Sequence, residues 1–174
     1  MDDDSETKKS YTNDYDMKHR EFTCKRGQLT LRGSLFHPSE GERFPIAVVS
    51  HEFMANRLFT IRYAKLLASL GYAAFCYDFS GGCIVGGSQG KTTDMTVFTK
   101  MEDLKAVIAY AKAQPYTDPD RLLLMGCSQG GLVTALTAAE LGEQAEAIIL
   151  FYPALSIPDD ARKGSMIRAK FDPK

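Results

Sequence analysis

Residues 121–136, RLLLMGCSQGGLVTAL, decide the fold of this chain. Residues 121–125 form a short apolar run typical of a buried strand, and residues 130–141 have the composition of a helix. Between the two lies GCSQG at residues 126–130, a G-x-S-x-G pattern. The pattern alone is common, but its place directly between a strand and a helix is the setting of a nucleophile elbow. The alternative is an ordinary glycine-rich turn.

Each residue of this pattern has an expected role. Gly126 and Gly130 have no Cβ, so the strand and the helix can approach closely at a sharp turn. Ser128 is then raised above the carboxyl edge of the sheet, where the helix N-terminus favours negative charge. We therefore predict Ser128 as the nucleophile and the backbone N–H of Gln129 as one donor to an oxyanion.

Apolar runs alternate with amphipathic stretches over the rest of the chain. We predict two antiparallel strands near the start, at residues 21–24 and 28–36. Buried strands are expected at residues 45–50, 72–77, 121–125 and 147–151. Helices are expected at residues 58–70, at 94–113 with Thr93 or Asp94 as its cap, and at 130–141. This alternation predicts an α/β fold, with a mainly parallel sheet and helices on both faces.

Composition narrows the classes of partner. The chain has 174 residues, a net charge of -1, and 44% hydrophobic residues, so it can bury a core and has no electrostatic reason to bind nucleic acid or an anionic membrane. No stretch reaches the roughly 20 apolar residues of a membrane span. No His, Cys or carboxylate cluster has metal-ligand spacing, and the glycines of residues 81–90 match no nucleotide fingerprint, so we expect no metal and no cofactor.

The compartment is inferred from the termini and the cysteines. The amino-terminal residues are too acidic and polar for a signal peptide, and the four cysteines have no paired spacing. We expect a cytoplasmic protein. Whether the chain forms a homodimer stays open.

A second loop completes the predicted site. Residues 50–56, SHEFMAN, directly follow the strand at 45–50. With this loop and the G-x-S-x-G elbow, the chain from about Glu21 onward resembles the small intracellular α/β-hydrolase esterases, which include bacterial cinnamoyl and feruloyl esterases. The resemblance implies the α/β-hydrolase fold, the backbone N–H of Phe53 as second oxyanion donor, and a supporting role for His51. Glu52 stands where that family commonly has glycine, and Asp78 is expected to organise the glycine-rich loop that follows the next strand.

The base that a serine nucleophile needs has no obvious candidate. In this fold the acid and then the histidine follow the serine along the chain. Three histidines precede Ser128: His19, His37 and His51. Three carboxylates follow residues 151–153: Asp159, Asp160 and Asp172. Since the resemblance implies two more strands, we expect a truncated chain whose acid and histidine lie beyond Lys174; the alternative is a natural short relative.

These observations predict three regions and one leading function. Residues 1–20 are expected to form a loosely attached tail, 21–153 the amino-terminal part of the α/β-hydrolase core, and 154–174 the start of a lid insertion. The predicted function is hydrolysis of carboxylic esters through an acyl-enzyme, and the resemblance suggests hydroxycinnamoyl or other small acyl esters as small-molecule substrates. On its own this chain is expected to be inactive or very weak. The alternatives are a peptidase of the same fold and a non-catalytic binding relative.

Overall fold

The strands of the sheet follow the apolar runs of the sequence. The computed structural model describes residues 16–82 and 85–163, and six strands of these residues form one sheet. The strands are β1 (Met17–Arg26), β2 (Leu29–Pro38), β3 (Phe44–Ser50), β4 (Ala73–Tyr77), β5 (Thr117–Cys127) and β6 (Ala147–Phe151). Their order in the sheet is β1-β2-β4-β3-β5-β6; β1, β2 and β4 pair antiparallel, and β4, β3, β5 and β6 pair parallel.

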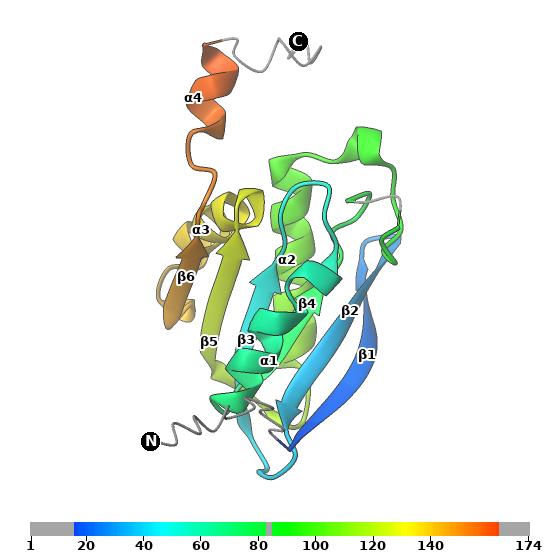
Figure 1. The fold of residues 1–174 in the computed structure, drawn as a ribbon, viewed down its shortest axis with the longest axis vertical. Coiled ribbons are helices and arrows are strands. Elements are labelled where there is room, and N and C mark those ends of the chain that lie inside the picture. The colour runs from blue at the N-terminus through cyan, green and yellow to red at the C-terminus, as the bar shows by residue number, and fades with distance from the viewer. Residues whose placement is uncertain (1–15, 83–84, 164–174) are drawn as a thin grey trace, which may run out of the picture.

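Helices cover both faces of this sheet, as Figure 1 shows. The helices are α1 (Ile61–Ser69), α2 (Val97–Lys112), α3 (Gln129–Leu141) and α4 (Ile157–Arg162), with short 3-10 helices η1 (Arg57–Phe59), η2 (Thr92–Asp94) and η3 (Gly142–Gln144). Along β3, Ile46 and Val48 pack in the cluster of α2 and α3, whereas Ala47 and Val49 pack in the cluster of α1. Because side chains alternate along a strand, a strand buried on both faces is apolar throughout. The predicted mainly parallel sheet with helices on both faces is confirmed.

The amino-terminal boundary of the core differs from the prediction. β1 begins at Met17, and Met17–Arg20 pair with Leu35–Pro38 of β2, so these residues belong to the sheet and not to a tail. Lys18, His19 and Arg20 are all exposed, so neither face of this part of β1 is buried and no apolar pattern marks it as a strand. The remainder of the predicted tail, residues 1–15, lies outside the described residues.

Two further elements differ from the prediction. Helix α2 begins at Val97 and is capped by Thr96, whose hydroxyl accepts from the Thr99 N–H at 3.0 Å, so neither Thr93 nor Asp94 is the cap. A reciprocal capping box fixes this start, and Asp94 ends η2. Strand β6 is not buried: Ile148 and Phe151 are nearly half exposed, since among the described residues β6 pairs only with β5.

Candidate active site

Ser128 lies at the turn between β5 and α3, with its backbone in a rare conformation. Its φ is 51° and its ψ is -120°, a region that L residues seldom adopt and that costs about 1–3 kcal/mol. The surrounding backbone holds it there: the Ser128 N–H donates to the Phe151 carbonyl at 3.1 Å, and its own carbonyl accepts from Gly131 at 2.9 Å. The residue is partly exposed, and no described side chain hydrogen bonds to its hydroxyl. A sharp, strained turn between a strand and a helix is the geometry that the sequence predicted for residues 126–130.

The two predicted glycines lie where no side chain fits. A Cβ at Gly126 would lie 2.3 Å from the Gly130 carbonyl oxygen, so the strand and the helix touch directly across the turn. A Cβ at Gly130 would lie 2.4 Å from the His51 carbonyl oxygen and 2.6 Å from that of Ser50. The elbow therefore packs backbone against backbone on the loop that follows β3, which is the predicted oxyanion loop.

His51 is fully buried at the start of this loop, and both of its ring nitrogens are engaged. Its Nδ1 bonds to the Glu52 carbonyl at 2.7 Å, and its Nε2 accepts from the Phe79 N–H at 3.2 Å. Since Nε2 accepts, Nδ1 carries the proton and the ring is neutral. Burial lowers the pKa of His51 to about 4, which keeps it neutral. The ring joins the loops after β3 and β4 and has no nitrogen left to serve as a base.

Phe53 and Gln129, the two predicted oxyanion donors, meet around one lysine. The ammonium of Lys100 on α2 donates to Gln129 Oε1 at 2.6 Å and lies 5.3 Å from the centre of the Phe53 ring. The same ammonium lies 4.7 Å from the ring centre of Phe79. The structure thus brings positions 53 and 129 to one place beside the elbow. Sequence analysis missed Lys100, although its spacing from Val97 and Leu104 places it on the apolar face of the helix.

Glu52, which replaces the glycine common at this loop position, makes a long-range contact. Its Oε1 accepts from the Tyr152 hydroxyl at 2.5 Å, and Tyr152 follows directly after β6 with a φ of 38°. The hydrogen bond to Glu52 and then burial raise the pKa of Tyr152. This hydrogen bond joins the loop after β3 to the segment after β6. Glu52 thus adds a connection across the site that a glycine at this position could not make.

Asp78 organises the loop after β4 through backbone hydrogen bonds. Its carboxylate accepts from the backbone N–H of Arg57 at 2.7 Å and from that of Gly87 at 2.8 Å. The Arg57 guanidinium pairs with the same carboxylate at 2.6 Å and with Glu21 at 3.0 Å. This arrangement fits the expected structural role of Asp78. No sequence pattern singled out Arg57, because its partners are 21 and 36 residues away.

The other sequence candidates lie away from the elbow or outside the described residues. His37 stacks on Tyr116 and packs at a tilted angle against Phe44, at the amino ends of β3 and β5, on the opposite edge of the sheet. His19 is exposed on β1. Among the acids, Asp159 pairs with Arg162 within α4, and Asp172 is not among the described residues. α4 itself lies beyond the carboxyl end of β6, away from the sheet (Figure 1).

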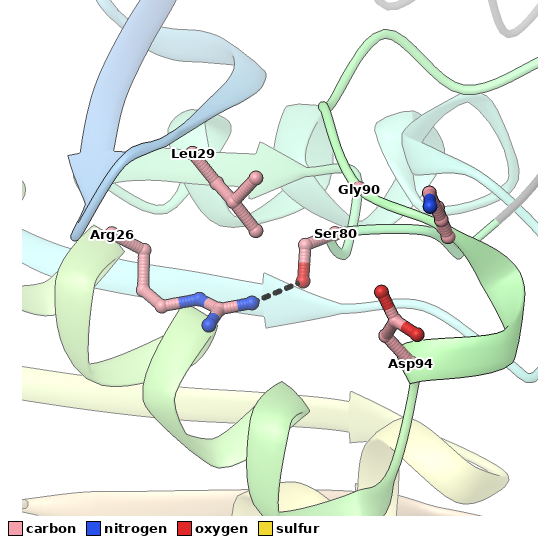
Figure 2. Close-up of a pocket in the computed structure, with 6 residues that line it drawn as sticks. Arg26, Leu29, Ser80, Gly90 and Asp94 are labelled. Atoms are coloured by element: carbon pink, nitrogen blue, oxygen red, sulfur yellow. Dashed lines mark hydrogen bonds between the residues drawn. The ribbon is translucent and has the colours of Figure 1, made fainter.

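A shallow cavity of about 320 Å³ opens near the loop after β4. It is lined by Arg26, Leu29, Ser80, Gly90, Lys91 and Asp94. Figure 2 shows Arg26 reaching across it to the Ser80 hydroxyl, a contact of 2.7 Å, and the same guanidinium pairs with buried Asp103 at 2.7 Å. Through these contacts Arg26, at the end of β1, holds the β1–β2 hairpin against α2.

Residues 16–82 and 85–163 contain no group of three or more potential metal ligands. In the same ranges no helix has both the length and the apolar character that crossing a bilayer requires.

Comparison with known proteins places these features in a family context. Residues 42–172 match the model of a family described as serine aminopeptidase, S33. The quorum-quenching protein AidA of Acinetobacter baumannii (strain MDR-ZJ06) is 30% identical over 107 residues, which are 60% of this chain and 34% of that protein. The chain therefore spans about a third of this curated relative.

Solved structures agree with the fold. The ferulic acid complex of Est1E from Butyrivibrio proteoclasticus superposes with a TM-score of 0.76 and 29% identity, over 87% of this chain and 60% of that one. The α/β hydrolase GrgF from Penicillium sp. sh18 superposes with a TM-score of 0.68 and 26% identity, over 88% of this chain and 53% of that one. The chain thus spans three fifths or less of each of these two proteins.

Proposed function

The chain belongs to the hydrolase family described as serine aminopeptidase, S33, and from that premise we propose that it is a serine hydrolase that cleaves carboxylic esters, with Ser128 as nucleophile. The observation that carries the proposal is the Ser128 backbone, held at a φ of 51° between β5 and α3. Such strain persists where the surrounding structure imposes it, and it clusters at sites of chemistry. Here it keeps a partly exposed hydroxyl at the amino end of a helix.

The proposed chemistry is acyl transfer. The Ser128 hydroxyl attacks the acyl carbon, the alcohol leaves, and water then releases the acyl group from the enzyme. The backbone N–H groups of Phe53 and Gln129 donate to the oxyanion of each tetrahedral intermediate, while Gly126, Gly130 and the His51 ring hold the two loops together. The packing of Gly130 on the His51 carbonyl supports this pairing of loops.

The proposed substrate class comes from the relatives. A feruloyl esterase-like assignment is supported by Est1E, a 29% identical protein whose structure contains ferulic acid. We propose hydroxycinnamoyl esters or other small acyl esters. The family description names an aminopeptidase, so aminoacyl amides are the competing substrates, and a non-catalytic binding protein is the competing class.

Covalent labelling tests the nucleophile. A fluorophosphonate probe should label the whole encoded protein on Ser128, and Ser128→Ala should abolish labelling. Ser69→Ala, at a serine of similar exposure on α1, is the matched control and should label like wild type. Absence of labelling in the whole encoded protein would remove the serine hydrolase proposal and leave a binding protein.

Substrate profiling then separates esterase from peptidase. We expect hydrolysis of methyl ferulate and p-nitrophenyl acetate and little cleavage of aminoacyl p-nitroanilides. The 174-residue chain alone should turn over p-nitrophenyl acetate about 10⁴-fold or more slowly than a serine hydrolase with a positioned histidine, because His51 has no free nitrogen. Faster amide than ester cleavage would favour the peptidase.

A further inference from the structure

Lys100 is a buried cation beside the proposed site. Its side chain is 1% exposed on α2, although lysine is among the residues least often fully buried. Its hydrogen bond goes to the amide oxygen of Gln129, and in the described part of the chain it forms no ion pair with a carboxylate. Asp103, three residues further along α2, pairs with Arg26 and accepts hydrogen bonds from the Ser80 N–H and hydroxyl.

A buried charge in this position lowers stability, so its presence indicates a task. An amide oxygen, two ring faces and the nearby Asp103 carboxylate compensate the buried ammonium only in part, so its burial costs free energy that an apolar residue at the same place would not cost. Burial lowers the pKa of Lys100 to about 8, so the side chain is still mainly charged at neutral pH. The fold thus keeps a costly charge where Val97, Met101 and Leu104 supply an apolar face.

The contacts of the ammonium indicate the task. One contact holds the side chain of Gln129, whose backbone N–H begins α3, and the other holds the ring of Phe53, which is half exposed and therefore has little packing of its own. A cation over an aromatic face is attracted by the ring, more strongly when it is shielded from water. A single group thus fixes one residue on each side of the proposed oxyanion hole.

We propose that Lys100 is a positioning residue that holds Phe53 and Gln129 at the spacing at which their N–H groups receive an oxyanion. The proposal rests on the proposed function, since it assigns Lys100 to that same site. Lys100 takes no proton and touches no reacting atom. It acts on the rate only through the two segments that it joins.

The charge of Lys100 gives this role a pH signature. The charged groups that influence it are Asp103 on its own helix, which raises its pKa, and His51 on the loop after β3, which is neutral above pH of about 4. Gln129 and Phe79 contribute no titrating group. As pH rises through about 8 the ammonium loses its proton, its contacts weaken, and turnover should fall.

The test compares Lys100→Met, Lys100→Arg and the control Lys105→Met in the whole encoded protein. Lys105 lies on the same helix but pairs with Glu102 and Glu140 at the surface. The substrate is p-nitrophenyl acetate, and phenylboronic acid serves as the transition-state analogue that adds to the serine. For Lys100→Met we expect kcat and the affinity for phenylboronic acid to fall about 10- to 100-fold, because misplaced donors act on the transition state, with KM nearly unchanged.

Lys100→Arg and thermal unfolding distinguish positioning from a structural role. A guanidinium keeps its charge, so Lys100→Arg should retain most of kcat and lose the decline above pH 8. Lys100→Met should unfold at the same or a higher temperature than wild type. Wild-type kcat and boronate affinity in Lys100→Met, or a lowered unfolding temperature with an unchanged pH profile, would overturn the positioning role while the esterase proposal stands. Turnover that persists in Ser128→Ala would instead remove both.

Discussion

The two ends of the parallel strands are built differently. Each end has a buried histidine and an Arg–Asp pair: His51 and Arg57–Asp78 at the carboxyl end, His37 and Arg43–Asp118 at the amino end. At the carboxyl end Asp78 is 2% exposed and the pair is 2.6 Å long, whereas at the amino end Arg43 is 60% exposed and the pair is 3.4 Å long. At the carboxyl end the buried Arg57–Asp78 ion pair thus fixes loops, whereas at the amino end the Arg43–Asp118 pair is largely exposed to water.

Backbone geometry differs in the same direction. The carboxyl end contains the strained Ser128 and two glycines, Gly126 and Gly130, that have backbone atoms within 2.6 Å of a hypothetical Cβ. At the amino end Gly71, just after α1, has a positive φ but nothing within 4 Å of such an atom. Strain at a non-glycine residue and close backbone packing at the carboxyl end indicate that accurate positions matter there.

The Arg57–Asp78 pair should give the largest difference between the two ends. Arg57→Met leaves the Asp78 carboxylate buried without its cation and should lower the free energy of unfolding by about 3–5 kcal/mol. Arg43→Met removes an exposed pair and should change it by less than about 1 kcal/mol. Urea unfolding at pH 7 measures both. Equal losses in the two variants would mean that the ends do not differ in the way that burial indicates.

The two histidines should differ in their effect on acid stability. Burial lowers the pKa of His51 to about 4, whereas in the unfolded chain it is about 6.5. Because the unfolded chain binds the proton first as pH falls, the stability from neutral His51 is complete above pH of about 6.5 and is lost progressively towards pH 4. The difference of about 2.5 pKa units corresponds to about 3 kcal/mol.

Variants separate this effect from general acid denaturation. Urea unfolding of wild type, His51→Gln and His37→Gln between pH 7 and pH 4 should show a flatter slope for His51→Gln. His37→Gln should change the slope less, because burial lowers the pKa of both histidines but His37 is 6% exposed whereas His51 is fully buried. Parallel slopes for wild type and His51→Gln would contradict the neutral buried ring.

The sequence predicted the apolar framework well because burial imposes a pattern on it. Residues 46–49 and 122–125 are apolar throughout since helices cover both sides, and the glycines of residues 126–130 mark a turn at which a side chain would clash. Two predictions failed at the edges of the described sheet: Met17–Arg20 were left out of the first strand, and β6, whose bounds were predicted correctly, was expected to be buried. Most side chains of both segments face water, so their sequence does not indicate how they pair.

The candidate residues were predictable where they directly follow a strand and not where they act through a long-range charge. Positions 51, 53, 128 and 129 follow from loops directly after strands, which parallel pairing brings to one edge. Lys100 and Arg57 have partners 29 and 21 residues away, and no local pattern identifies such pairs. A charged residue at an apolar helix position, as at Lys100, is the one signal that a sequence offers for them.

The smallest expected effect tests the strain itself. At Ser128 a glycine adopts a φ of 51° without steric penalty, so Ser128→Gly should be more stable than Ser128→Ala, which keeps the Cβ, by about 1–2 kcal/mol. The matched pair at the amino end is Ser69→Gly and Ser69→Ala in the last turn of α1, where glycine should be the less stable by about 0.5–1 kcal/mol. Urea unfolding at pH 7 compares the four variants. If glycine is the worse residue at both positions, the turn at Ser128 stores no strain, and the carboxyl end would owe its rigidity to buried charge alone.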